Sequence, residues 1–198
     1  MHHLGHIYLA EGPPAFQFGA FIADGIRNPQ LAQLPPLMQL GVRFHRWVDW
    51  QTDRHPSFLV ARRLLRPVAG RYAGLIVDLW LDAALGQAWE RHAPEPLETF
   101  AARFQKETLE PHWRWLPLSW HTFAEALKKE HLLLSFGSYA GMLEHIARFI
   151  RRRQLPLDFV QIQQTLLVQQ QALEELLQGF WQEAQEWRHT ADSFARIA

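Results

Sequence analysis

The stretch that decides the fold of this chain is a ten-residue segment that combines apolar and ligand-type side chains at helical spacing. It reads Phe44-His45-Arg46-Trp47-Val48-Asp49-Trp50-Gln51-Thr52-Asp53. At about 100° per residue, its imidazole, hydroxyl and two carboxylates fall within roughly 100° of arc on a helix. Phe44 and Val48 form an apolar stripe beside them, which predicts that the polar row runs along the edge of a core.

Two interpretations of this polar row are open. Imidazole and carboxylate groups on a rigid scaffold are typical ligands of Mn²⁺, Fe²⁺ or Zn²⁺. The alternative is a solvated helix face whose side chains pair at i, i+4 spacing. The choice depends on which other side chains in the chain are suited to face the row.

The composition predicts one compact domain over residues 1–198. The chain is 48% hydrophobic and contains nine Trp and thirteen Phe, which is enough to build a sizeable core. It has no cysteine, so disulfides, thiolate metal sites and a cysteine nucleophile are excluded. Any metal must therefore use His, Asp or Glu as ligands.

The charge pattern argues against nucleic acid and membranes as partners. The formal net charge is zero, although basic clusters occur at Arg62, Arg63 and Arg66 and at residues 151–153. No apolar run approaches the roughly 18 residues of a membrane helix. The first six residues also lack the features of a signal peptide. We expect a soluble, cytoplasmic protein.

Apolar residues recur at helical spacing throughout the chain, and no segment is typical of a strand. The predicted helices cover residues 16–25, 37–53, 72–91, 94–110, 120–136, 139–153 and 156–187, with one more that Ser57 caps and that Pro67 and Gly70 end. No internal repeat or linker divides them. The sequence therefore predicts a single all-α helical bundle.

Three further carboxylates interrupt apolar helix faces. Asp24 falls in the last turn of a buried helix, where it needs a cation or a donor nearby, and a salt bridge to Arg27 is the alternative. Asp78 and Asp82 lie one turn apart on the apolar face of the 72–91 helix. Aspartates are almost never fully buried unless paired, so these two call for a metal or for arginines. The candidate arginines are Arg43, Arg46 and Arg71.

At this point the sequence resembles a known family. His6, Asp24, the row from His45 to Asp53 and the Asp78/Asp82 pair occur in the order and spacing of the acyl carrier protein phosphodiesterases, also called acyl carrier protein hydrolases. The resemblance starts at His6-Ile7-Tyr8-Leu9-Ala10, is clear to the helix of Trp89, and is weaker beyond it. That family is considered distantly related to the histidine-aspartate (HD) metal-dependent phosphohydrolases, which implies an HD-like, all-α architecture.

The resemblance also implies an activity and its residues. The reaction is hydrolysis of the phosphodiester that joins 4′-phosphopantetheine to the serine of acyl carrier protein, with Mn²⁺ as the metal. The implied metal ligands are Asp24, His45, Asp49, Asp78 and Asp82. Arg46 would stabilise charge on the phosphoryl oxygens, His6 would act as general acid or as a further ligand, and Thr52 and Asp53 would support the ligands. The acidic carrier would dock on Arg62, Arg63 and Arg66, or on residues 151–153.

One position departs from the family pattern. The family usually has Asp-His where this chain has Asp82-Ala83, and alanine offers no lone pair. Either His92 or His112 takes its place, or the protein binds metal weakly and is catalytically impaired. Two alternative functions remain, namely hydrolysis of another small phosphoester with the same residues and a non-catalytic helical binding protein.

Overall fold

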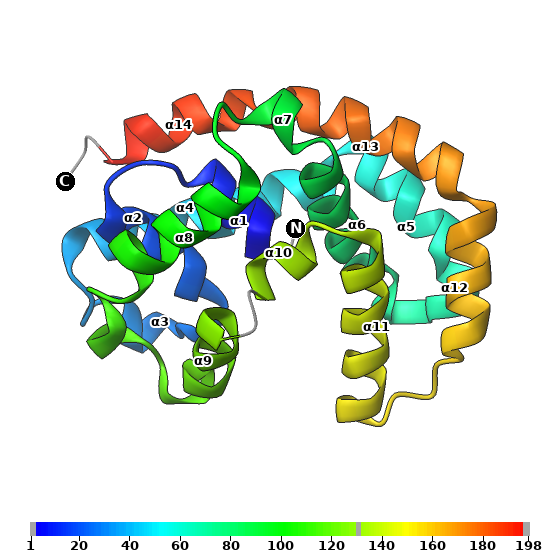
Figure 1. Ribbon diagram of the computed structural model, residues 1–198, viewed down its shortest axis with the longest axis horizontal. Coiled ribbons are helices and arrows are strands. Elements are labelled where there is room, and N and C mark those ends of the chain that lie inside the picture. Colours follow the sequence, from blue (N-terminus) through cyan, green and yellow to red (C-terminus); the bar gives the residue numbers. More distant parts are fainter. Residues whose placement is uncertain (1–2, 130–131, 196–198) are drawn as a thin grey trace.

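The computed structural model describes residues 3–129 and 132–195, and in these ranges every regular element is a helix (Figure 1), which confirms the predicted all-α fold. The α-helices are α1 (His3–Leu9), α2 (Pro14–Ile22), α3 (Asn28–Leu31), α4 (Pro36–Arg54), α5 (Pro56–Ala69), α6 (Ala73–Gln87), α7 (Trp89–His92), α8 (Leu97–Arg103), α9 (His121–Lys129), α10 (Leu132–Phe136), α11 (Tyr139–Arg153), α12 (Phe159–Val168), α13 (Gln170–Ala184) and α14 (Glu186–Ala195). Short 3-10 segments are η1 (Ala23–Gly25), η2 (Gly70–Tyr72), η4 (Trp113–Trp115) and η5 (Leu118–Trp120), and η3 (Phe104–Leu109) is a π-helix. None of the described helices is long and apolar enough to cross a membrane.

Helices α2 and α4 cross at very short range, and two glycines make this possible. A Cβ atom on Gly41 would lie 2.0 Å from the carbonyl oxygen of Phe16, and one on Gly19 would lie 2.2 Å from that of Met38. Both helices start with a proline at the first helical position, where the missing N–H has no intrahelical partner to lose. The crossing therefore places α4, which carries His45 and Asp49, beside α2, which leads into the turn of Asp24.

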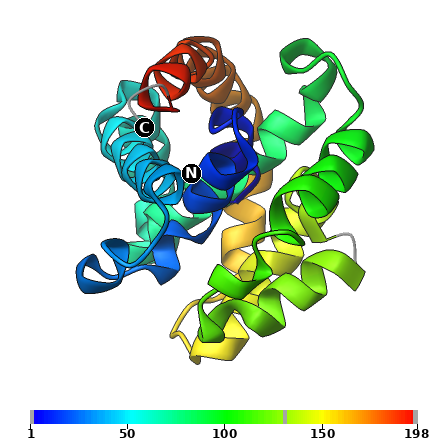
Figure 2. The same ribbon diagram turned by 90° about the vertical axis from the view of Figure 1, so that its left-hand side faces the viewer.

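Helix α1 packs against α2, α6, α10 and α14, and long-range hydrogen bonds tie the C-terminal helices to α1 and α6. Figure 1 shows α12, α13 and α14 following one another along the outer edge of the molecule, and the view in Figure 2 shows α14 beside the N-terminal helices. The indole of Trp181 donates to the carbonyl oxygen of Leu81 at 3.0 Å, and the hydroxyl of Tyr8 donates to that of His92 at 2.8 Å. These contacts hold α7 against α1 and α13 against α6.

The long helix predicted for residues 156–187 is wrong, because the chain forms α12, α13 and α14 there. The breaks fall at Gln169 and Gln185. Because α12 and α13 pack against α5 whereas α14 packs against α4, one straight helix would not follow both surfaces. In the same way the predicted 72–91 helix stops at Gln87, and a separate turn, α7, follows.

Other predicted boundaries also differ. The cap of α5 is His55 instead of Ser57, because its Nδ1 accepts the N–H of Ser57 at 3.2 Å. Pro67 lies inside α5, which ends before Gly70, a residue with a φ of 54°. The predicted 16–25 helix becomes α2 followed by η1, and the predicted 94–110 helix becomes α8 followed by η3. The predicted 120–136 helix appears as α9 and α10, with residues 130–131 outside the described part.

We expect Gly41→Ala to lower the free energy of unfolding by about 1–3 kcal/mol, because the new methyl group would force α2 and α4 apart. Urea denaturation would measure the change. Gly179→Ala in α13 is the control, since no atom lies within 4 Å of its Cβ position. That variant should be unchanged or more stable by up to about 1 kcal/mol. Equal stability of the two variants would contradict the tight crossing.

Candidate metal centre

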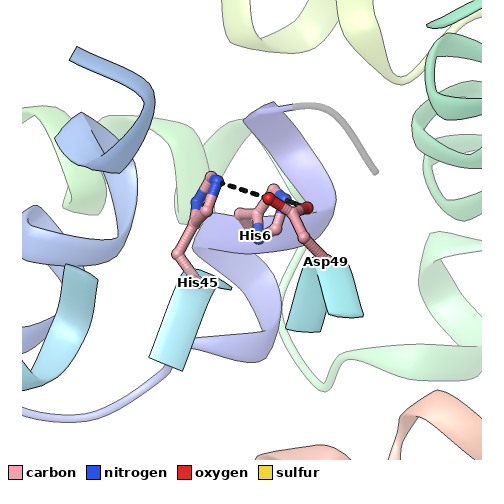
Figure 3. Close-up of side chains that lie close together, drawn as sticks. All are labelled: His6, His45 and Asp49. Atoms are coloured by element: carbon pink, nitrogen blue, oxygen red, sulfur yellow. Dashed lines mark ion pairs between the residues drawn. The ribbon is translucent and has the colours of Figure 1, made fainter. Parts of the chain in front are cut away.

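His45 and Asp49 lie one turn apart on α4, and a backbone carbonyl fixes the orientation of the imidazole. The Nδ1 atom of His45 donates to the carbonyl oxygen of Ala20 at 2.8 Å. This leaves Nε2 facing two carboxylates, at 3.3 Å from Oδ1 of Asp24 and 3.2 Å from Oδ2 of Asp49. The close-up in Figure 3 shows His45 and Asp49 converging from α4. The i, i+4 spacing predicted from the sequence is therefore realised in space.

His6 completes the cluster from α1. Its Nε2 atom lies 3.0 Å from Oδ1 of Asp49, and its ring stacks on that of His45 with a centroid distance of 3.6 Å (Figure 3). Both imidazoles are buried, with 3% and 4% of their surface exposed, whereas Asp49 is 40% exposed. The cluster therefore has a closed inner side and an open carboxylate side.

The pKa values of the two histidines move in opposite directions. Burial, together with the neighbouring His45, lowers the pKa of His6 from 6.5 to about 4. Burial alone would also lower the pKa of His45, but its contacts with Asp24 and Asp49 raise it to about 9. Contact with His45 holds the pKa of Asp24 at about 2, and despite its burial Asp49 keeps a lowered pKa through both histidines. At neutral pH a protonated His45 thus lies beside two ionised carboxylates, and the cluster keeps an excess of negative charge.

The donor set fits a divalent transition metal. His6, His45 and Asp49 each offer a ligand atom, and these atoms lie within 4.8 Å of one another. Both nitrogens of His6 and Nε2 of His45 are buried without a hydrogen-bond partner of adequate geometry. Unpaired buried nitrogens are costly, and two imidazoles with a carboxylate suit Mn²⁺, Fe²⁺ or Zn²⁺. A cation here would take the place of the proton on His45.

Asp24 reaches the cluster from η1, and Arg46 holds the chain next to it. The side chain of Asp24 is 63% exposed. Asp24 therefore lies at the open edge of the cluster and not in the buried position expected from the sequence. The guanidinium of Arg46 donates to the carbonyl oxygen of Ile26 and to Oδ1 of Asn28, both at 2.8 Å. Arg46 therefore anchors the segment that follows Asp24. A contact with phosphoryl oxygens stays a prediction.

Asp82 has a different position from that of the other predicted ligands. It is fully buried in α6, and its two carboxylate oxygens accept the backbone N–H groups of Leu4 at 2.8 Å and Gly5 at 3.0 Å. Burial raises the pKa of Asp82 to about 7, while these two donors favour its ionised form. Asp82 thus holds the N-terminal turn of α1, the helix that carries His6. It does not belong to the group of converging ligand atoms found among the described residues.

The other predicted residues of the site, Asp78, Thr52 and Asp53, differ in how deeply they are buried. Asp78 is partly buried one turn before Asp82, and burial raises its pKa, with Asp49 and Asp53 acting in the same direction. Thr52 is buried with its hydroxyl unpaired, whereas Asp53 is exposed.

The basic cluster predicted to dock the carrier lies on α5. Arg62, Arg63 and Arg66 are exposed there, and two of them line a shallow pocket with Arg71. The docking role of this surface stays a prediction.

The position of the missing histidine is filled by core packing. Ala83 is buried, with 2% of its surface exposed. Neither suggested substitute occupies its place, because Nδ1 of His112 contacts the carbonyl oxygen of Thr108 at 2.7 Å and His92 contacts Gln185. The cluster therefore rests on His6 and His45 as its imidazoles.

The sequence analysis missed His3. Its ring packs against Phe21, Trp120, Phe123 and Phe136, with centroid distances of 4.6–6.0 Å. Burial lowers the pKa of His3 to about 3. The charge of Asp24 acts to raise this pKa, whereas His6 and His45 act to lower it. The available signal was its spacing of three residues from His6, which places both rings on one side of a helix.

Comparison with known proteins identifies the relatives of this chain. The family model described as acyl carrier protein phosphodiesterase matches residues 1–184. A Photorhabdus laumondii protein named acyl carrier protein phosphodiesterase is 26% identical over 152 residues, which are 77% of each chain. An Escherichia coli protein of the same name is 32% identical over 114 residues, 56% of this chain and 59% of the relative. No solved structure matches the chain.

We expect Asp82→Ala to lower the free energy of unfolding by about 2–4 kcal/mol, because two buried N–H groups of α1 would lose their acceptor. Thermal and urea unfolding would measure the loss. Asp53→Ala removes an exposed carboxylate from α4 and serves as the control, with an expected change within about 0.5 kcal/mol. If Asp82→Ala were as stable as the control, Asp82 would not anchor α1.

The stability of metal-stripped protein should fall as the pH rises from 6.5 to 9. The pKa of His45 is raised on folding from 6.5 to about 9, so its contribution is complete below pH 6.5 and is lost as the pH passes the folded value. Urea unfolding in EDTA would measure a slope of up to about 1.4 kcal/mol per pH unit. His45→Gln should have a flatter profile, since all other titrating groups are shared. Parallel profiles would show that His45 does not carry the proton.

Proposed function

The chain belongs to the acyl carrier protein phosphodiesterase family, and we propose that it hydrolyses the phosphodiester that joins 4′-phosphopantetheine to a serine of acyl carrier protein. In this reaction the oxygen of water bonds to phosphorus and the bond from phosphorus to the serine oxygen breaks. The serine oxygen takes up a proton. The products are 4′-phosphopantetheine and the apo form of the carrier.

The observation that carries this proposal is the cluster of His6, His45 and Asp49. Two buried imidazoles with unpaired nitrogens face a half-exposed carboxylate, and their ligand atoms lie within 4.8 Å. The Nε2 atoms of both imidazoles face carboxylate oxygens at 3.0–3.3 Å, whereas Nδ1 of His6 is buried without a hydrogen-bond partner. Perturbed titratable groups that converge at an open edge are typical of a functional site.

We propose that the cluster holds Mn²⁺ through His6, His45 and Asp49, with Asp24 at its open edge. The ion would polarise a phosphoryl oxygen and lower the pKa of a water molecule, which is the usual contribution of such metals to phosphoester hydrolysis. The neutral state of His6 at pH 7 suits a ligand, because its burial already disfavours protonation. The carbonyl oxygen of Ala20 keeps the proton of His45 on Nδ1 and so leaves Nε2 for the metal.

The residues of the chain have separate tasks in this proposal. Asp49 contacts both imidazoles and so holds them at a fixed separation. Arg46 positions Asp24 by binding the carbonyl oxygen of Ile26. The stacked rings of His6 and His45 exclude water from the inner side of the centre, which leaves the side of Asp24 for the substrate.

We expect His45→Ala and Asp49→Ala to abolish both stoichiometric Mn²⁺ binding and formation of the apo carrier, with the far-UV circular dichroism retained. Metal analysis and a gel-shift assay of purified holo-acyl carrier protein would measure the two effects. The loss in kcat should reach at least about a hundredfold, since a ligand of the metal is removed. His189→Ala, an exposed histidine on α14, is the matched control and should behave as the wild type.

The proposal fails if wild-type protein supplied with Mn²⁺ forms no apo carrier. It also fails if the His45→Ala variant turns over the carrier at the rate of the control.

A further inference from the structure

A cleft lies between α9 and α11. Figure 1 shows these two helices as facing walls, with α10 and α6 between them. The cleft has a volume of about 370 Å³, which lies within the usual range of small-molecule sites. Its apolar lining comes from Leu75, Leu79, Phe123, Ala126, Phe136 and Phe149.

His3 connects this cleft to the metal centre. Its ring lies 4.6 Å from that of Phe123 and 5.3 Å from that of Phe136, and both phenylalanines line the cleft. On the other side His3 precedes His6 by one turn of α1. The inner end of the cleft therefore lies against His3, in the first turn of the same helix that carries His6.

The entrance to the cleft carries hydrogen-bond donors, and its lining residues within the described ranges 3–129 and 132–195 include no carboxylate. Ser119, Thr122, Arg148 and Arg152 are lining residues that are exposed to solvent. His145 also lines the cleft, and its Nε2 lies 2.8 Å from the hydroxyl of Ser135. An apolar floor with a rim of N–H and O–H donors suits a flexible chain of methylene and methyl groups with amide carbonyls.

We propose that this cleft binds the pantetheine portion of the substrate, while its phosphodiester lies at the centre formed by His6, His45 and Asp49. This inference rests on the proposed function. The dimethyl and methylene groups of pantetheine pack on Phe123, Ala126 and Phe136. The amide carbonyls accept hydrogen bonds from the rim, where Arg152 and Arg148 are the strongest donors. The cleft thereby selects carriers that have been modified with the prosthetic arm.

Two matched pairs of variants test the site. Ala126→Trp fills the cleft, whereas Ala140→Trp places the same bulk on an exposed position of α11 outside it. Arg152→Ala removes a donor of the rim, whereas Arg151→Ala removes the same charge from the neighbouring exposed position that does not line the cleft. Because residues 151–153 are also a candidate dock for the carrier, Arg151→Ala is the control for the titration with pantetheine only. The second pair adds no bulk to the core, so it remains informative if Ala126→Trp fails to fold.

Calorimetric titration with pantetheine, which lacks the phosphate, measures binding independently of the metal and of turnover. Wild-type, Ala140→Trp and Arg151→Ala proteins should bind it equally. Ala126→Trp and Arg152→Ala should bind it at least about tenfold more weakly, since each removes contacts with a small ligand. With holo-acyl carrier protein kcat/KM should fall similarly, whereas hydrolysis of bis(p-nitrophenyl) phosphate, which has no pantetheine, should be unchanged.

The inference is overturned if wild-type protein does not bind pantetheine, or if Arg152→Ala binds it as tightly as Arg151→Ala. Failure of the proposed function has a different signature. In that case pantetheine binds with the expected differences between variants, but no apo carrier is formed with added Mn²⁺.

Discussion

The hydrogen bond of 2.8 Å between Nδ1 of His45 and the carbonyl oxygen of Ala20 is the contact on which the centre depends. It forms only because α2 and α4 approach closely at Gly19 and Gly41, where any side chain would clash with backbone. The bond fixes which nitrogen of His45 faces Asp24 and Asp49. The close packing of α2 and α4 thereby determines the direction in which Nε2 of His45 points.

The charge balance of the centre explains why it suits a cation. Asp24 and Asp49 keep low pKa values because His45 carries a proton, and His45 keeps that proton because the carboxylates surround it. His6 is neutral because a second positive charge beside His45 would be costly in a buried position. One bound divalent ion would satisfy both carboxylates and the unpaired nitrogens at once. Ionised groups at such short distances are expensive without that compensation.

Asp82 illustrates how a buried carboxylate can serve a site without belonging to it. Asp78 and Asp82 need partners on an apolar face, and the partners expected from the sequence are a metal or arginines. The structure gives Asp82 the backbone N–H groups of Leu4 and Gly5, some 77 positions away in the chain. The free N–H groups at a helix N-terminus can bind an anion as a side chain does. The local sequence around Asp82 does not indicate which helix N-terminus will lie beside it. Through this anchor Asp82 sets the position of α1 and of His6.

The sequence by itself determined the all-α class and the row of His45 and Asp49, because these follow from periodicities and spacings within single helices. The family followed from the resemblance of the chain's motifs to those of a known family. The sequence also identified His6 and Asp24 as candidates. Only the tertiary structure decided that His6 stacks on His45, that Asp82 holds α1, and that His3 packs against two phenylalanines that line a cleft between α9 and α11. It also decided that the C-terminal segment breaks into α12, α13 and α14. The physical reason is that contacts between distant helices depend on their crossing geometry and on close approach at particular glycines, and neither has a signature in local sequence.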